Sequence, residues 1–412
     1  MKKKATLYVL VVCLAGLSAP AALLPCTLAV VSGKAARDGR PLMWKNRDTS
    51  NPDNQMMFFA GSKYRFIGLV EAQDKKGKEV FGGLNSEGFA IMNSQSDDLA
   101  GKGKDGADNG VLMNLALGEC ASVRDFEALL DRVKGKYDLA ANFGVIDAEG
   151  NACFYETAPS AYVKFDTRDP RVAPFGYLVK TNYAFTSPDL SAGGGFIRFE
   201  RISRIFRSAR AENRITPRFI LREAARDLVN EKTHSHPLSE ELPRDPAAPL
   251  YINTNDTINR NSSVSAMLFQ GAPARDKAYL ATMWVVLGQP VSSAAIPLWT
   301  GAGKVPGVTA AGKTTAPLND LSRAIAAYLY PDSRGHMRQY LNVNRLRTYG
   351  GEGVLAKIMR IEDRVLERTF ARLAEWEKEK PREADVAAFE DELAAWVYDS
   401  LKSSFGLSPD SN

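Results

Sequence analysis

Three features of the sequence predict an α+β fold with antiparallel sheets and a helical C-terminal region. Short apolar runs separated by turn residues occupy the chain from residue 26 to about residue 290. Strands and helices occur there in blocks rather than as alternating βαβ units, which indicates layered sheets built from hairpins. After residue 317 the apolar residues change to the three-four spacing that is typical of amphipathic helices.

The strands are predicted as hairpins because pairs of apolar runs flank tight-turn sequences. Residues 27–32 and 41–45 flank Arg37-Asp38-Gly39-Arg40, and Asp-Gly is a typical tight-turn pair. Similar turn signals at residues 85–88 and 148–151 predict two further hairpins. The remaining strands are expected at 80–83, 88–93, 143–147, 152–156, 263–270 and 279–287.

Helices are predicted over residues 123–133, 198–227 and, in several pieces, 318–404. In the first of these, Phe126, Leu129 and Val133 fall on one face. The C-terminal region carries a longer stripe that Pro381 ends. We expect that stripe to be core, with dimerisation as the alternative. It consists of Leu355, Ile358, Glu362, Val365, Thr369, Leu373 and Trp376.

Length and composition limit the class of protein. The 412 residues allow two or three domains, and the pattern divides them into a leader (1–25), a main domain (26–312) and a helical region (313–412). Hydrophobic residues at 45% and charged residues at 25% are ordinary globular values and exclude bulk disorder. The net charge is +5, but three lysines of the leader contribute to it. The near-neutral remainder lacks the charge footprint of a nucleic-acid binder.

The amino terminus predicts an export signal. Lys2, Lys3 and Lys4 precede a short apolar run over residues 7–17, and Ala19-Pro20-Ala21 supplies the small residues that signal peptidase reads. The run is shorter than the about 20 residues that span a bilayer. We therefore expect a cleaved leader and a periplasmic or secreted protein, with a retained anchor as the alternative.

Cys26 follows this leader directly and is the candidate nucleophile. Cleavage after Ala21 would leave residues 22–25 as a propeptide. The Cys26 thiol can attack the carbonyl of Pro25, and hydrolysis of the resulting thioester then releases the propeptide and frees the α-amine, with removal by a peptidase as the alternative. The exposed α-amine, with a pKa of about 7.7–8.0, then adjoins a thiol with a pKa of about 8.5 and can take its proton without a histidine. The three histidines all lie in polar, loop-like sequence, so a histidine-dependent triad is hard to build: His234, His236 and His336.

Two other cysteines follow, and they lie among apolar residues. Cys120 and Cys153 are expected to be small buried hydrophobes, with a disulfide between them as the alternative.

Several motifs in order resemble a known superfamily. Cys26-Thr27, Asp38-Gly39 and Trp44-Lys45-Asn46-Arg47-Asp48 resemble the opening of the N-terminal-nucleophile amide hydrolases. The likeness is greatest to the isopenicillin-N acyltransferase-like group, and next to choloylglycine hydrolases and cysteine dipeptidases. Residues 83–93, 142–156, 180–185 and 195–201 resemble later motifs of these families. The resemblance covers roughly residues 26–290, so the helical region after 318 has no counterpart in it.

The resemblance implies a four-layer αββα sandwich and a set of site residues. Cys26 would be the nucleophile and Asp48 would orient its α-amine. Asn93, or Gln95 in a neighbouring register, would donate its amide to the oxyanion. Lys45, at a position where bile-salt hydrolases usually have arginine, would bind the substrate. The remaining implied residues are Asn182 and Arg198 around the nucleophile, with Arg201 as the alternative arginine, and Thr27 beside the substrate.

These observations predict an exported enzyme that hydrolyses linear carbon–nitrogen bonds other than peptide bonds, or transfers the acyl group. The expected partner is a small-molecule amide or N-acyl compound, with no cofactor, metal or nucleic acid, and a homo-oligomer is possible. One alternative is a cysteine dipeptidase that reads a substrate amine through Asp97 and Asp98. The other is a lipid-anchored binding or scaffold protein with an acylated Cys26.

Overall fold

The computed structural model describes residues 26–406 except 97, 100–107, 190, 192, 235, 236, 238 and 333. The predicted leader, Asp97 and His236 therefore lie outside the described residues. None of the described helices has the length and apolar character required to cross a membrane.

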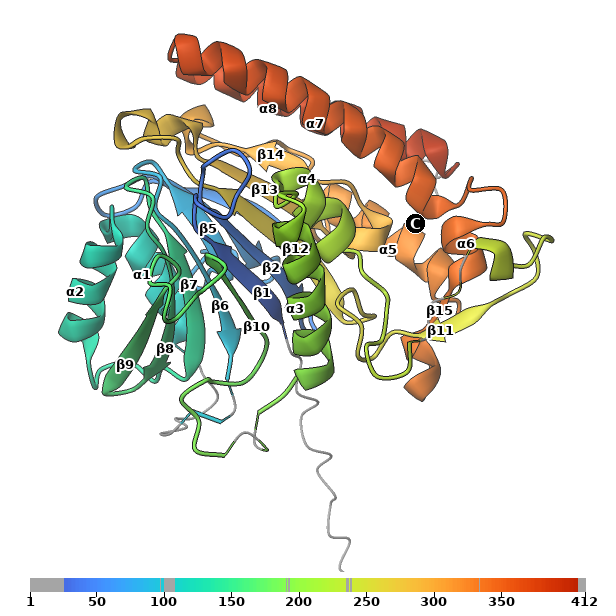
Figure 1. Cartoon of the computed structure of the whole chain (residues 1–412). Helices are drawn as coiled ribbons and strands as arrows, with labels where there is room; N and C mark the ends of the chain where they lie inside the picture. Colours follow the sequence, from blue (N-terminus) through green and yellow to red (C-terminus); the bar gives the residue numbers. More distant parts are fainter. Residues whose placement is uncertain are drawn as a thin grey trace, which may run out of the picture.

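Two antiparallel sheets are stacked face to face at the centre of the molecule (Figure 1). Strand β1 of the first sheet contacts β7 and β8 of the second, so the strand that follows Cys26 lies at the interface between the sheets. All five residues of β1 are buried, as expected for a strand covered on both faces. The six-stranded sheet has the order β10 (Tyr177–Lys180), β1 (Thr27–Val31), β2 (Leu42–Asp48), β12 (Ser263–Gln270), β13 (Thr282–Leu287) and β14 (Ile296–Leu298).

The second sheet is a meander in which each strand pairs with the next along the chain. This connectivity needs only short turns, which explains why hairpin signals dominate its sequence. The seven strands are β3 (Asn54–Phe59), β4 (Phe66–Glu71), β5 (Gly82–Asn85), β6 (Ala90–Gln95), β7 (Ala141–Ile146), β8 (Ala152–Ala158) and β9 (Ala161–Asp166). A separate pair joins β11 (Tyr251–Asn253) to β15 (Tyr340–Asn342).

Helices α1 (Asn109–Glu119) and α2 (Val123–Val133) cover the outer face of the seven-stranded sheet. The prediction for α2 is confirmed to the residue. Ser122 and Asp125 form a capping box at its start, which satisfies backbone N–H groups that the helix leaves unpaired. Phe126 packs edge-on against Tyr155 with ring centroids 5.3 Å apart, which anchors the helix to β8.

The remaining helices cover the outer face of the six-stranded sheet, which completes an αββα sandwich (Figure 1). The predicted C-terminal stripe is largely buried in this layer rather than on a free surface. Trp376 of α7 packs against Trp299 next to β14, with ring centroids 5.0 Å apart. The helices are α3 (Phe196–Ala211), α4 (Pro217–Phe219), α5 (Pro317–Leu329), α6 (Val343–Arg347), α7 (Val354–Lys378) and α8 (Glu383–Ser404).

A buried ion pair explains the acidic residue within this apolar stripe. Glu362 of α7 accepts two hydrogen bonds of 2.7 Å from Arg226 and a third of 3.0 Å from the Ala295 N–H. Burial alone would raise the pKa of Glu362, but the Arg226 guanidinium outweighs it and lowers that pKa. The C-terminal region is thus joined to the sandwich by charge as well as by apolar contacts.

The structure corrects two details of the sequence interpretation. The single helix predicted over residues 198–227 is wrong in its middle, because the chain turns at Asn213, which has a φ of 51°, and restarts as α4 with Thr216 as its N-cap. Strand β13 begins later than predicted, since a 3-10 turn occupies Arg275–Leu280. Cys120 and Cys153 are free, buried thiols, and no disulfide joins them.

Candidate active site

The predicted nucleophile lies at the start of an inner strand. Cys26 immediately precedes β1 and is 7% exposed. Thr27 pairs with Asn46 of β2 in an antiparallel register, which carries Asp48 past the start of β1 to the nitrogen side of Cys26. The register therefore places the Asp48 carboxylate on the side of the Cys26 backbone nitrogen.

Arg198 holds the backbone at Cys26. Its Nη1 donates hydrogen bonds of 2.8 Å to the Cys26 carbonyl oxygen and 2.7 Å to Thr27 Oγ1, and its Nη2 lies 3.5 Å from Asn182 Oδ1. Burial lowers the pKa of this guanidinium to about 10, so it stays charged at neutral pH. The alternative arginine, Arg201, instead pairs with Asp227 at 2.6 Å, away from the nucleophile.

A glycine makes room for this arginine at the start of α3. Gly195 has a φ of 83°, a conformation that favours glycine. A Cβ atom added there would lie 2.2 Å from Arg198 Nη2 and 2.9 Å from Thr181 Cβ. The Gly193-Gly194-Gly195 sequence has no phosphate-binding signature, and the structure gives its last glycine a specific steric role.

Asn182 connects the two sheets at the same place. Its backbone forms an isolated bridge with Gly194, and its Nδ2 donates a 2.8 Å hydrogen bond to the Gln95 carbonyl oxygen at the end of β6. The Asn182 side chain is therefore held between the strand that carries Asn93 and the helix that carries Arg198.

Lys45 and Asn93 contact each other in the candidate site. The Lys45 Nζ donates hydrogen bonds of 2.9 Å to Asn93 Oδ1 and 3.0 Å to the Phe81 carbonyl oxygen. Because Lys45 occupies the Asn93 oxygen, the Asn93 Nδ2 group is directed elsewhere as a donor. Burial lowers the pKa of Lys45 to about 8, and the electrostatic influence of Cys26 opposes that decrease.

Asp48 is buried and is held by residues that sequence reasoning missed. Its Oδ1 accepts a 2.6 Å hydrogen bond from Ser263 Oγ, and its Oδ2 lies 4.0 Å from Arg260 Nη1. Burial raises the pKa of Asp48, while the positive charges of Arg260 and then Arg198 oppose that rise. Only the pairing of β12 with β2 brings Ser263 next to Asp48, so no local sequence signal identified it.

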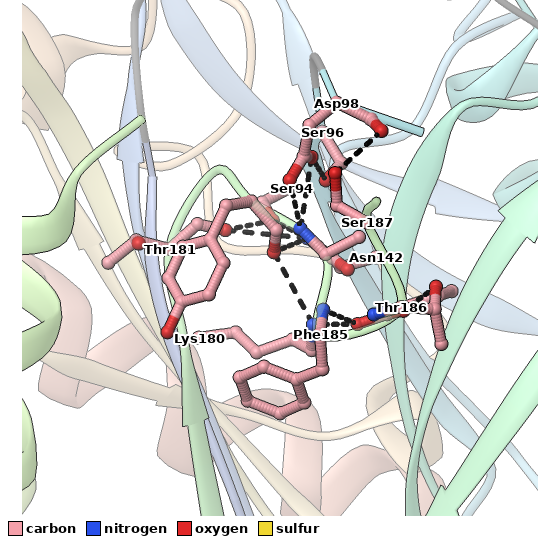
Figure 2. Close-up of polar contacts among 12 residues, drawn as sticks. Ser94, Ser96, Asp98, Asn142, Lys180, Thr181, Phe185, Thr186 and Ser187 are labelled. Atoms are coloured by element: carbon pink, nitrogen blue, oxygen red, sulfur yellow. Dashed lines mark hydrogen bonds and ion pairs between the residues drawn. The ribbon is translucent and has the colours of Figure 1, made fainter. Parts of the chain in front are cut away.

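A second layer of polar contacts fixes the loop that carries Asn182 (Figure 2). Glu156 of β8 forms a buried ion pair with Lys180 and accepts a 3.0 Å hydrogen bond from the Thr186 N–H. Asn142 Nδ2 donates to Ser94 Oγ at 3.2 Å. Asp98 accepts two 3.0 Å contacts from the Ala184 N–H.

The structure thus brings together all seven predicted site residues around the start of β1. They are Cys26, Thr27, Lys45, Asp48, Asn93, Asn182 and Arg198. Within the described ranges, no group of three or more histidine, cysteine or acidic residues has the arrangement of a metal site. The chemistry that this arrangement offers is a thiol, a carboxylate and amide donors in a buried, cation-rich setting.

Comparisons with solved structures give low similarity over the sandwich. The conjugated bile acid hydrolase of Clostridium perfringens is 10% identical with a TM-score of 0.39, over 66% of this chain and 92% of its own. A Caenorhabditis elegans N-acylethanolamine-hydrolyzing acid amidase ortholog is 15% identical with a TM-score of 0.39, over 63% of this chain and 100% of its own. For penicillin V acylase from Agrobacterium tumefaciens, the values are 11% and 0.38, over 66% and 85%. No curated protein sequence matches the chain.

The family comparison covers the segment that contains most of the site. Residues 35–239, about half of the chain, match the family model described as acyl-coenzyme A:6-aminopenicillanic acid acyl-transferase. The matched segment begins shortly after Cys26 and includes five of the site residues: Lys45, Asp48, Asn93, Asn182 and Arg198. Over residues 35–239 the chain thus matches an acyltransferase family, and the protein is an enzyme that acts on carbon–nitrogen amide bonds.

Proposed function

We propose that the chain is an exported amidase or acyltransferase whose nucleophile is Cys26, exposed as the mature amino terminus. One observation carries the proposal. The Oδ2 atom of Asp48 is buried on the nitrogen side of Cys26 and accepts no hydrogen bond from any described residue. An unsatisfied buried carboxylate oxygen is costly. The α-amine that leader removal would create is the missing donor.

The proposed reaction uses the amine as the base for the thiol of the same residue. The α-amine takes the Cys26 thiol proton, and the sulfur attacks the carbonyl carbon of the substrate amide. The resulting tetrahedral intermediate collapses when the amine returns the proton to the leaving nitrogen, which leaves an acyl thioester on Cys26. Water then attacks the thioester to release the acid, or a second amine attacks it to give a new amide.

The negative charge of the intermediate would be stabilised by the Asn93 Nδ2 group and a backbone N–H. The Lys45 contact supports this role, because it holds the oxygen end of the Asn93 side chain and leaves the nitrogen end as donor. Donors fixed before the reaction begins stabilise the intermediate without reorganisation.

We also propose how the leader is removed and in which compartment the protein acts. The sequence of residues 1–25 supports export followed by cleavage, and self-removal of residues 22–25 would use the same thiol and oxyanion donors as substrate turnover. The protein would then act in the periplasm or outside the cell.

The two alternatives find less support. A dipeptidase would read the substrate amine through Asp97 and Asp98. Asp97 lies outside the described residues, and the Asp98 carboxylate already accepts from the Ala184 N–H and from Ser96 Oγ at 2.8 Å. For a lipid anchor, Cys26 would have to leave its buried position at the sheet interface. Intact mass separates the cases, because an anchor adds acyl mass to Cys26 and an enzyme does not.

The test is turnover of an amide panel by matched cysteine variants. The panel contains N-acyl amino acids, bile-acid conjugates, penicillins and dipeptides, which differ in the acyl group and the amine. Cys26→Ala is expected to lose all turnover and to retain the propeptide. Cys120→Ala, which removes a buried thiol outside the site, is expected to keep the wild-type substrate profile. Turnover by Cys26→Ala at the wild-type rate would contradict the proposed function.

A further inference from the structure

A buried arginine outside the set implied by the resemblance faces the catalytic carboxylate. Arg260 lies just before β12, is 6% exposed, and places its Nη1 4.0 Å from Asp48 Oδ2. Its Nη2 donates a 2.9 Å hydrogen bond to Asn255 Oδ1. Its Nε and Nη1 atoms donate to no described residue. Burying a cation whose N–H groups lack acceptors lowers the stability of the folded protein. A buried arginine of this kind is therefore a candidate for a functional role.

The short segment that begins with Arg260 controls both oxygens of Asp48. The Arg260 backbone N–H donates to Ser263 Oγ at 3.0 Å, and that hydroxyl donates to Asp48 Oδ1 at 2.6 Å. The Ser263 N–H in turn donates to the Arg260 carbonyl oxygen at 3.0 Å. A register shift between Ser263 and Ser265 of β12 adjoins this turn. This turn therefore orients Asp48 Oδ1 through the Ser263 hydroxyl. It also places the positive charge of Arg260 opposite Asp48 Oδ2.

The charges around Asp48 come from several segments of the chain, and cations outnumber anions. Strand β2 contributes Lys45 and Arg47, and Arg47 is paired with Glu71 of β4. The other ionisable groups that act on the site are Arg198 of α3, Arg260 and Asp256 of the segment before β12, and the Cys26 thiol. A proton added to Asp48 or to a neighbouring amine therefore brings positive charge into an already positive site.

We propose that Arg260 is a positioning residue for Asp48, which keeps the carboxylate ionised and keeps the adjoining Cys26 amine from being protonated. This inference rests on the proposed function, because it concerns the base that the proposed mechanism uses. Both effects act in the same direction: without the Arg260 charge, the carboxylate and amine pair takes up a proton at a higher pH. Arg260 would thus set the lower pH limit of activity.

The test is the pH dependence of kcat/KM, whose acidic limb reports the essential base of the free enzyme. Arg260→Gln is expected to move the acidic limb to higher pH by about one unit or more, as a nearby charge typically does. Arg260→Lys keeps the charge and is expected to restore a limb close to that of the wild type. Arg334→Gln, at an exposed arginine paired with Asp332, is the matched control and should leave the profile unchanged.

A second measurement needs no substrate. The rate at which iodoacetamide alkylates Cys26 should show the same acidic shift in Arg260→Gln, because the same amine serves the thiol. If Arg260→Gln fails to fold, Asn255→Ala carries the test, since it removes only the anchor of the Arg260 Nη2 and should shift the limb in the same direction by less.

The outcomes separate the two proposals. An active wild-type enzyme whose acidic limb is the same in Arg260→Gln, or in Asn255→Ala when the first variant does not fold, overturns the role of Arg260 and leaves the proposed function intact. A wild-type protein that turns over no amide and whose Cys26 stays internal overturns both. A loss of activity in Arg260→Gln that is equal at every pH also overturns the positioning role, because it indicates structural damage alone.

Discussion

Lys45 of β2 donates a 2.9 Å hydrogen bond to Asn93 Oδ1 of β6, and this contact joins the two sheets near Cys26. Lysine is a compact charge without the planar fork of the arginine that bile-salt hydrolases usually have at this position. Its pKa of about 8 makes it a group that titrates near neutral pH, which an arginine there would not be. The contact therefore links the orientation of Asn93, the proposed oxyanion donor, to the charge of Lys45.

Asn93→Ala removes the proposed oxyanion donor. We expect kcat to fall by about 100- to 1000-fold, as with other single oxyanion donors, while KM changes much less. Steady-state kinetics on the best amide of the panel measures both constants. A variant with an unchanged kcat and a raised KM would assign Asn93 to substrate binding instead.

Lys45→Arg is expected to change the basic side of the pH profile. The Lys45 ammonium is present below a pH of about 8 and is lost above it, so the wild type should lose activity as the pH rises through that value. The arginine stays charged, so the basic limb of the variant should move to higher pH. The same basic limb in both proteins would show that Lys45 does not titrate during turnover.

Gly195→Ala should displace Arg198 from the nucleophile. A Cβ atom at this position would lie 2.2 Å from the Arg198 Nη2, and the positive φ adds backbone strain. We expect kcat/KM to fall by about tenfold or more, since displacements near 1 Å can cost about 100-fold. Gly307→Ala is the control, because nothing lies within 4 Å of a Cβ atom there. Equal activity of the two variants would remove Arg198 from the site.

Glu362→Gln tests the contact between the C-terminal helices and the sandwich. Removing the carboxylate leaves the Arg226 charge buried, which should lower the free energy of unfolding by about 3 to 5 kcal/mol. Glu367→Gln changes an exposed pair on the same helix and should cost less than about 1 kcal/mol. Denaturant unfolding at pH 7 compares the two variants.

The same pair has a pH signature. The pKa of Glu362 is lower in the folded protein than its ordinary value of 4.5, so its carboxylate stabilises the fold above that value. This contribution is lost as the pH falls from 4.5 through the folded pKa. The difference in unfolding free energy between wild type and Glu362→Gln should therefore shrink in acid. A difference that is constant from pH 7 to pH 3 would contradict the ion pair.

Local patterns in the sequence were enough for several of the hairpins and for helix α2. The hairpin of β7 and β8 has a turn signal at its tip, and the amphipathic spacing of α2 gave its limits. The break between α3 and α4 was missed, because apolar residues continue across it and only Pro217 marks the restart. Strands β3, β4, β9 and β10 were also missed. Strands β3, β4 and β9 pair with neighbours along the chain, so only β10, which pairs with β1, depends on a partner that is distant in sequence.

Part of the candidate site could also be predicted from the sequence, and part could not. Its seven predicted residues lie in motifs whose order resembles known families, so each of them could be named from the sequence. Arg260 and Ser263 follow no such motif, and they reach Asp48 only because β12 pairs with β2. In the sequence, these two polar residues are typical of an ordinary turn before a strand. This part of the site depends on the pairing of β12 with β2, which short sequence patterns do not encode.

N-terminal sequencing of the active, mature protein tests the central claim most directly. The account predicts that the chain begins Cys26-Thr27-Leu28, with an unmodified α-amine on its first residue. An active preparation in which Cys26 remains joined to Pro25, or carries an acyl group on its nitrogen, would contradict it.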